Sequence, residues 1–216
     1  PVYHSRIFQP RLTLSSNYFA GHALVMGLEY CGDRLTSDRF VNHKMTSRTL
    51  EETEFYVQDD WTVNNHWMFS GGVRTNFSEA FGFMYMPKIA AKYSPDGYWA
   101  IRANYSMGYR SPSIKELFFN WDHLGMFMIK GNEFLKPEKN NYVSAGVEYS
   151  NRHFFFNSTL YGNFYRKKIE GVWRIYDMQY NFEYVNLDRQ TIAGVDLLGR
   201  WTPTDWLTLN ASYSYV

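Results

Sequence analysis

The segment from Met107 to Glu138 reads MGYRSPSIKELFFNWDHLGMFMIKGNEFLKPE and separates two stretches in which apolar and polar residues alternate. Residues 99–107 before it read WAIRANYSM, and residues 143–149 after it read VSAGVEY. An alternation with a period of two is typical of β-strands and not of helices. We therefore expect the segment to be a long loop between two strands, and long loops in all-β proteins usually carry function.

The same alternation recurs along the whole chain and predicts about ten strands. They are expected at residues 12–18, 24–30, 54–61, 67–76, 88–93, 99–107, 143–149, 154–165, 193–201 and 207–215. Most are close to the roughly 9–11 residues that cross a lipid bilayer as a tilted strand. The expected fold class is all-β: an antiparallel up-and-down transmembrane β-barrel, of which this chain supplies a part. A soluble β-sandwich or propeller, with the apolar faces packed in a core, is the alternative.

The predicted connections alternate in length. Short turns are expected near residues 20–21, 63–66, 94–97, 150–152 and 202–205. Longer connections are expected at residues 32–48, 76–86, 108–139 and 166–190, the last with room for an extra hairpin. Aromatic residues crowd the short turns, namely Trp61, Trp67, Tyr93, Tyr98, Trp99, Trp201 and Trp206. One tight rim with an aromatic girdle and one elaborated rim are typical of membrane β-barrels.

The composition narrows the class of protein. The 216 residues carry a net charge of +1, so no nucleic-acid-binding surface is indicated. Aromatic residues make up 19% of the chain, a high share that favours membrane interfaces. A mean hydropathy of -0.44 does not exclude a membrane, because alternating strands hide their apolar face from an average. The chain starts at Pro1 and stops at Val216 within an alternating stretch, so we expect a piece of a longer protein.

Motifs in and around the central segment resemble the signature region of TonB-dependent outer-membrane receptors. The matching residues are Gly108-Tyr109-Arg110-Ser111-Pro112, Ile114, Glu116-Leu117-Phe118, Gly131-Asn132, Leu135-Lys136-Pro137-Glu138 and Gly146-Val147-Glu148, with Phe55 to Asp60 and Gly71 to Arg74. That family consists of 22-stranded barrels with an N-terminal plug, which import metal chelates, haem, cobalamin or oligosaccharides. The resemblance implies that residues 1–216 are part of a single barrel domain, with the plug and the remaining strands absent.

The resemblance also implies a location, a function and partners. The barrel would cross the outer membrane of a Gram-negative bacterium many times, in contact with lipid, and would reach the TonB complex through the absent plug. It would import an iron-containing ligand, haem or a ferric siderophore, by energised transport. Catalysis, nucleic acid and an intrinsic cofactor are not expected. Cobalamin or an oligosaccharide is the alternative ligand, and a soluble carbohydrate-binding β-protein is the alternative class.

Haem receptors of this family carry an Arg-Ala-Pro box, a ligating histidine and an Asn-Pro-Asp-Leu box. Here Tyr109-Arg110-Ser111-Pro112 resembles the first box, Asn132-Glu133-Phe134-Leu135 stands where the second would be, and His123 lies between them. Ser111 replaces Ala, and Glu133-Phe134 replace Pro-Asp. The resemblance marks His123 as the candidate ligand of haem iron, because a neutral imidazole is a good axial ligand.

Neighbouring residues are assigned by their chemistry. Trp121, Met126 and Met128 would supply apolar walls around a porphyrin, and Tyr109 is a candidate second ligand, stacking surface or packing residue. His123 could instead form hydrogen bonds within a packed loop. The residues expected to shape the loop are Arg110, Pro112, Glu116, Asn132, Pro137 and Glu138, with Arg110 paired to Glu116 or Glu138. The sequence contains no nucleophile elbow, phosphate loop or zinc spacing that would indicate an enzyme.

Overall fold

The computed structural model describes residues 3–41, 44–176 and 178–216, and its strands form one large sheet. The strands are β1 (Tyr3–Phe8), β2 (Arg11–Ser16), β3 (His22–Val41), β4 (Lys44–Thr62), β5 (Trp67–Ser78), β6 (Gly82–Tyr93), β7 (Trp99–Arg110), β8 (Asn120–His123), β9 (Phe127–Lys130), β10 (Glu138–Ser150), β11 (Phe154–Tyr176), β12 (Gln179–Thr204) and β13 (Leu207–Tyr215). A short helix, α1 (Ile114–Phe118), lies between β7 and β8. Within the described ranges, no helix is long and apolar enough to cross a membrane.

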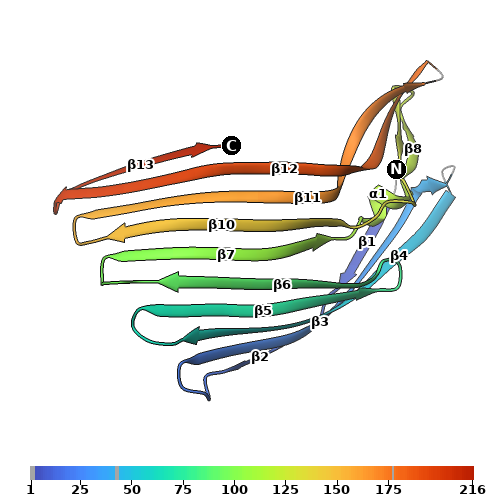
Figure 1. Ribbon diagram of the computed structural model, residues 1–216. Helices are drawn as coiled ribbons and strands as arrows, with labels where there is room; N and C mark the ends of the chain where they lie inside the picture. Colours follow the sequence, from blue (N-terminus) through green and yellow to red (C-terminus); the bar gives the residue numbers. More distant parts are fainter. Residues whose placement is uncertain (1–2, 42–43, 177) are drawn as a thin grey trace.

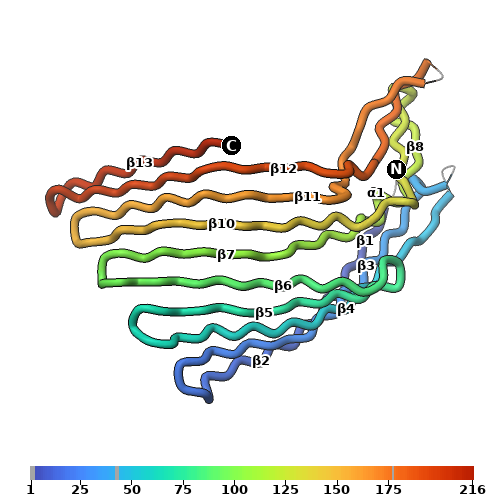
Figure 2. Tube along the Cα trace, in the orientation of Figure 1, coloured from blue at the N-terminus to red at the C-terminus, as the bar shows by residue number. Residues whose placement is uncertain are grey.

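Strands that are consecutive in the chain mostly lie side by side and antiparallel (Figure 1). The order is β1-β3-β4-β5-β6-β7-β10-β11-β12-β9-β8, with β2 paired to β3 and β13 paired to β12. Short β9 runs parallel to β12. In the Cα trace the long strands are joined at alternating ends (Figure 2). The all-β up-and-down prediction is confirmed: the ten predicted strands correspond to β2–β7 and β10–β13, and β1, β8 and β9 are additional.

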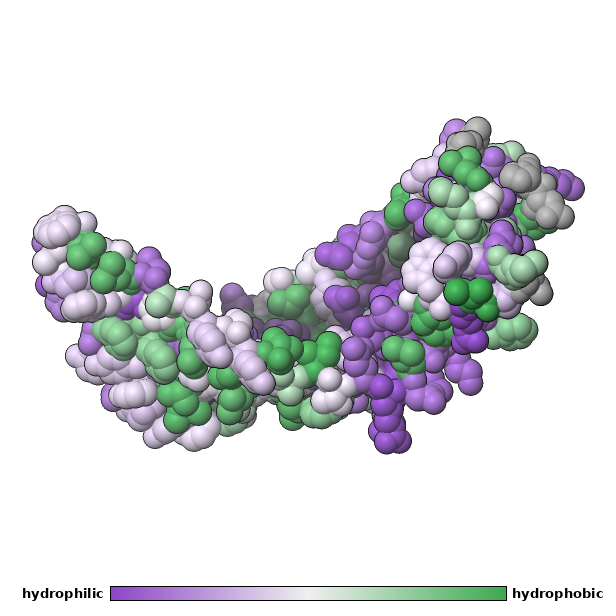
Figure 3. Space-filling model, turned by 90° about the horizontal axis from the view of Figure 1, so that it is seen from above, coloured by the Kyte–Doolittle hydropathy of each residue, from purple (hydrophilic) through white to green (hydrophobic). Residues whose placement is uncertain are grey.

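The two faces of this curved sheet differ in polarity. Apolar side chains that alternate along the strands stay exposed, for instance Leu12, Leu14, Phe55, Ile89, Ile101, Val143, Leu160 and Phe164. Arg102, next to Ile101, points to the opposite face and pairs with Glu148 at 2.8 Å. Figure 3 shows hydrophobic residues over the convex side of the strands. The described strands form one sheet, so the alternative of a sandwich with a shared core is wrong.

The tight rim carries the predicted aromatic girdle. The ring centroids of Trp67 and Tyr93 lie 4.5 Å apart on adjacent strands, and those of Trp99 and Tyr149 lie 4.8 Å apart. The turns beside them span residues 63–66, 94–98 and 151–153. Amphipathic rings prefer the boundary between lipid and water, so this rim marks one edge of the bilayer.

The opposite rim differs from the predicted alternation of short and long connections. The connection between β5 and β6 is a tight turn at residues 79–81, not a long loop. Residues 32–48 and 166–190 also belong mainly to strands, because β3 continues beside β4 and β11 continues beside β12 beyond the apolar band. Ladder hydrogen bonds do not require apolar side chains, so these polar extensions escaped a prediction based on alternating hydrophobicity.

Buried apolar side chains gather at this elaborated rim. One cluster joins Leu35 and Phe40 of β3 to Ile114 of α1, and a second joins Leu117 to Ile169 of β11. The loop at residues 111–137 is therefore packed between the β3–β4 hairpin and the β11–β12 hairpin (Figure 1). This packing gives the loop a defined position above the barrel wall.

Candidate ligand-binding site

The loop begins with a capped helical turn. The Ser113 hydroxyl accepts a hydrogen bond from the Glu116 backbone N–H at 3.3 Å, and the Glu116 carboxylate accepts one from the Ser113 backbone N–H at 2.8 Å. This reciprocal arrangement is a capping box, which fixes the start of α1. Pro112 precedes it, is fully buried and lacks an N–H, so β7 ends here as expected.

Arg110 links the two ends of the loop. Its guanidinium lies 3.0 Å from Glu116 and 3.5 Å from Glu138, the residue with which Arg110 is paired across β7 and β10. Glu138 also accepts a hydrogen bond from the backbone N–H of Ile169 at 3.0 Å. The expected carboxylate partners of Arg110 are therefore both present, and they join β7, α1, β10 and β11.

Two asparagines, Asn132 and Asn186, hold the loop return, which is the part of the loop at residues 131–137 that leads back to β10. The Asn132 amide donates to the Tyr184 carbonyl at 3.1 Å, and the backbone N–H of Asn132 donates to the Glu116 carbonyl at 2.8 Å. Asn186 of β12 forms three further hydrogen bonds of 2.8 Å: one from Lys136 N–H, one to the Lys136 carbonyl and one to the Lys167 carbonyl. The sequence analysis did not single out Asn186, because it lies 50 residues from its loop partner.

Replacing Asn186 by alanine is expected to loosen the loop return. Three hydrogen bonds are lost, and at about 0.5–1.5 kcal/mol each the local cost is on the order of 2 kcal/mol. Hydrogen exchange should accelerate roughly tenfold or more at residues 131–137 while the strands stay protected. The control is Asn64→Ala, which removes two hydrogen bonds to His66 and Trp67 at the tight rim. Equal exchange in both variants would contradict this role of Asn186.

The hairpin of β8 and β9 forms the middle of the loop. Leu124 and Gly125 at its tip both have positive φ, 56° and 75°, as the central residues of a type I′ turn do, and Met126 N–H closes this turn by donating to the His123 carbonyl at 3.0 Å. The carboxylate of Asp122 accepts a hydrogen bond from Gly125 N–H at 3.1 Å. Because β9 also pairs with residues 180–183 of β12, the hairpin extends the barrel wall above the membrane.

Rings of this hairpin and of the β11–β12 hairpin form a continuous series of contacts, the aromatic row. Its members are Trp121, His123, Phe127, Trp173, Phe182 and Tyr184. Successive centroids lie 5.0, 4.8, 5.0, 5.1 and 5.3 Å apart. Most contacts are edge-to-face, whereas His123 and Phe127 are stacked with 22° between their planes. Burial raises the pKa of the Tyr184 hydroxyl, and Glu116 acts in the same direction, so this end of the row stays neutral.

Two polar atoms in the row have no hydrogen-bond partner among the described residues. They are Nδ1 of His123 and Nε1 of Trp121, both buried. The Arg39 guanidinium of β3 lies 4.1 Å from the Trp121 ring centroid and covers that ring. Buried donors or acceptors without partners are rare, and they indicate where a ligand or water completes the hydrogen bonding.

Only some of the residues expected to bind ligand come together. His123 lies opposite Phe127 and Asp122 opposite Met128, so Met128 points to the other face of the hairpin from His123. Met126 lies in the turn with 58% of its surface exposed. The described part of the chain shows no ring contact between His123 and Tyr109, whose buried hydroxyl has no partner there. His123 and Trp121 share a face, and Trp173, which sequence analysis did not select, lies two contacts along the row from His123.

Metal coordination by several side chains is not supported in the described ranges. No group of three or more His, Cys, Asp or Glu residues there is arranged to hold a metal ion. The chemistry available where Trp121, His123 and Phe127 meet is aromatic stacking and an imidazole, with the guanidinium of Arg39 beside them.

The family model for the β-barrel of TonB-dependent receptor-like proteins matches residues 3–216. The chain belongs to the TonB-dependent receptor family. This receptor chain forms part of an outer-membrane β-barrel of a Gram-negative bacterium, in agreement with the exposed apolar faces and the aromatic girdle. The family consists of transporters and not of enzymes, as the sequence analysis expected.

Curated relatives of this TonB-dependent receptor match over parts of their length. The iron-regulated outer membrane virulence protein of Vibrio cholerae is 26% identical over 133 residues, covering 60% of this chain and 20% of the relative. The probable hemoglobin and hemoglobin-haptoglobin-binding protein 4 of Haemophilus influenzae is 25% identical, over 52% and 12%. The vitamin B12 transporter BtuB of Photobacterium profundum is 24% identical, over 88% and 29%. The chain thus spans less than a third of these relatives.

Solved structures agree with the fold of the receptor. The siderophore receptor PirA of Pseudomonas aeruginosa superposes with a TM-score of 0.85 at 16% identity, covering 99% of this chain and 42% of that structure. A mutant of the ferric enterobactin receptor PfeA of the same organism superposes with a TM-score of 0.83, also at 16% identity, over 99% and 35%. At such identities the likeness concerns the fold alone.

Proposed function

We propose that this chain binds an iron-containing ligand at the elaborated rim, for energised import across the outer membrane. The observation that carries the proposal is the aromatic row, in which the His123 ring is held between Trp121 and Phe127. Such a row offers aromatic surface to a flat organic ligand, and an imidazole can complete the coordination of a haem iron. The names of relatives that are iron-regulated or bind hemoglobin support this choice.

The proposal extends to parts beyond this chain. A plug domain and the remaining strands would complete the barrel, and the plug would contact the TonB complex that supplies energy. The polar hollow face, with ion pairs such as Arg74–Glu54 at 3.1 Å, suits a lumen filled by such a plug and water. Residues 1–216 would then form part of one barrel domain.

Haem ligation by His123 is tested by titrating haemin into the full-length receptor in detergent. Replacing His123 by alanine should shift the Soret band and weaken binding at least roughly tenfold, because an axial ligand of the iron is lost. His66→Ala is the matched control, since His66 is an exposed histidine beside a turn at the opposite rim. An unchanged spectrum and affinity in the His123 variant would refute haem ligation by this residue.

A ferric siderophore is the second candidate, and the surroundings of His123 favour it. An iron-bound histidine usually donates its other ring N–H to an acceptor, whereas Nδ1 of His123 has no partner within the described residues. In this case Trp173→Ala should weaken binding of a ferric catecholate chelate, while His123→Ala should leave the affinity within about twofold. Competition by cobalamin, prompted by the similarity to BtuB, would instead favour the alternative ligand.

A further inference from the structure

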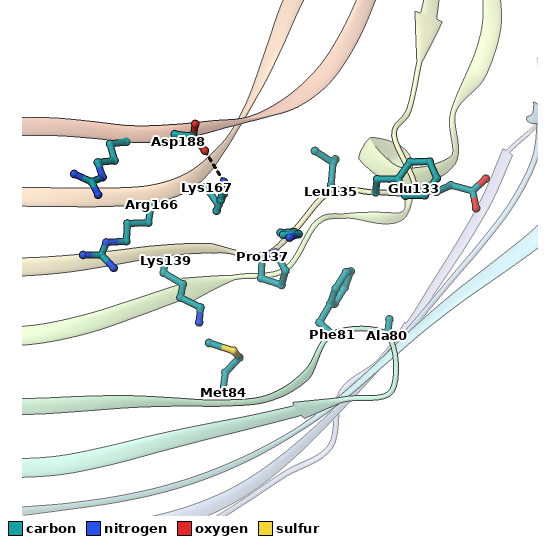
Figure 4. Close-up of a pocket in the computed structure, with 13 residues that line it drawn as sticks. Ala80, Phe81, Met84, Glu133, Leu135, Pro137, Lys139, Arg166, Lys167 and Asp188 are labelled. Atoms are coloured by element: carbon teal, nitrogen blue, oxygen red, sulfur yellow. Dashed lines mark hydrogen bonds and ion pairs between the residues drawn. The ribbon is translucent and has the colours of Figure 1, made fainter.

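A cavity of about 850 Å³ lies on the barrel wall below the loop return, away from the aromatic row. It is bordered by the β5–β6 turn, the loop residues 133–137 and the upper parts of β10, β11 and β12 (Figure 4). The cavity forms where two strands separate: pairing between β6 and β7 ends at Lys88 and Ser106, although both strands continue.

Three cations line this cavity in register across three strands. Lys139 of β10 is paired with Arg166 of β11, which is paired with Arg189 of β12. Cross-strand partners point to the same face, and the registers run without a break from these residues down into the barrel wall. The same alternation places Phe164 and Val143 on that face, and both are exposed apolar residues of the convex side. The three cations therefore point outward, just beyond the last apolar residues.

The charge at this place is unbalanced. Lys136 and Lys167 also line the cavity, which brings the basic residues to five against two acids, Glu133 and Asp188. Lys167 neutralises Asp188 at 2.5 Å, and its hydrogen bond holds the pKa of that carboxyl below the ordinary value. No ion pair of Lys139, Arg166 or Arg189 occurs in the described part of the chain. The excess charge is positive and exposed.

Apolar side chains complete the cavity on the side away from β12. They are Phe81, Met84, Phe134, Leu135 and Pro137. Phe134 is 90% exposed at the surface, while the next residue, Leu135, is buried. In Figure 4, Lys139 extends from β10 toward Met84 and lies between the basic and the apolar parts. Basic and apolar walls side by side match a ligand with an anionic headgroup and hydrocarbon tails.

We propose that this cavity binds the phosphorylated headgroup of a glycolipid of the outer leaflet. The elaborated rim of a membrane β-barrel faces the cell exterior, so the cations lie where outer-leaflet headgroups meet the wall. Lys139, Arg166 and Arg189 hold the phosphates, and Phe81 and Phe134 pack against the upper ends of the acyl chains. The site lies on the lipid side of the wall and is separate from the proposed site for the transported ligand.

The test is a titration of the delipidated full-length receptor with bisphosphorylated lipid A, followed by native mass spectrometry. Lys139→Gln/Arg166→Gln is expected to weaken binding about 30-fold, from a factor of about five for each cation near a lipid surface. The control is Lys88→Gln/Lys92→Gln, which removes the same charge. Its two lysines are register partners of Ser106 and Arg102 and hence point to the hollow face.

Each outcome decides the proposal. The proposal is supported if lipid A binds more weakly to Lys139→Gln/Arg166→Gln and as before to the Lys88→Gln/Lys92→Gln control. Dephosphorylated lipid A should also bind only weakly to the unaltered receptor. The proposal is overturned if both double variants bind lipid A as tightly as the unaltered receptor, or if both lose affinity to the same extent. Tight binding of the dephosphorylated lipid would also overturn it. Inorganic phosphate that binds as tightly as lipid A would show a site for free phosphate instead. If the double variant fails to fold, Arg166→Gln alone is expected to weaken lipid A binding about fivefold.

Discussion

Replacing Gly131 by alanine is expected to displace the loop and abolish much of the ligand binding at the elaborated rim. A Cβ atom at this position would lie 2.7 Å from the backbone carbonyl of Leu117 and from the backbone nitrogen of Phe118. Backbone atoms cannot rotate away, and Leu117 is held in a buried cluster with Leu135. Overpacking of this kind costs on the order of 1–3 kcal/mol, so the loop return must separate from α1.

The measurement is hydrogen exchange on the full-length receptor, combined with ligand affinity. Gly131→Ala should lose protection at residues 114–118 and 131–137, and affinity for the transported ligand should fall roughly tenfold or more. Gly199→Ala is the matched control, because a Cβ there meets no atom within 4 Å. Unchanged loop protection in the Gly131 variant would show that the loop does not depend on this close approach.

Replacing Arg110 by alanine is the second change with a large expected effect. The side chains of Glu116 and Glu138 are only 15% and 14% exposed, and removal of Arg110 leaves both carboxylates without their shared cation. Breaking a buried ion pair costs several kcal/mol, but Arg110 is 44% exposed, so solvent screening reduces the expected cost to about 2 kcal/mol. The loop should open at both ends while the barrel remains folded.

Two further variants separate this effect from a general loss of charge. Arg102→Ala breaks a 2.8 Å ion pair with Glu148 in the wall and should leave exchange in the loop unchanged. Adding Glu138→Gln to the Arg110 variant should restore part of the protection, because one unpaired charge is removed while an oxygen remains to accept from Ile169. Arg110 is not the link between the loop ends if Arg110→Ala and Arg102→Ala behave alike.

The strands inside the membrane were predictable because the environment of each strand constrains residues that are neighbours in the sequence. A strand such as residues 143–149 places apolar side chains toward lipid and polar side chains toward the lumen, so apolar and polar residues alternate along its sequence. The end of β7 could also be predicted from nearby residues, because Pro112 lacks an N–H and cannot continue the hydrogen-bond ladder of a strand. The carboxylate partners of Arg110 could be guessed from chemistry, because charges near a wall need counter-charges.

The site at the rim was only partly predictable. His123 and Trp121 could be selected from sequence, but the contact between Phe127 and Trp173 depends on two hairpins that pack together from distant segments. Met128 was expected beside His123 because the two are close in the chain, yet the hairpin turns it to the other face. Polar strands above the membrane carry no alternating signal, so the sequence left room for an extra hairpin in residues 166–190 but did not show that it continues β11 and β12.

The alternation in the sequence alone determined that this chain is a series of membrane-crossing antiparallel strands, because lipid on one face and polar surroundings on the other constrain each pair of neighbouring residues separately. Tertiary structure decided what the rim contains: the row of rings that joins His123 to Trp173, the three hydrogen bonds of Asn186, and the outward cations Lys139 and Arg166. These groups meet only when strands dozens of residues apart are set in register. Such distant pairing leaves no trace in the local order of residues.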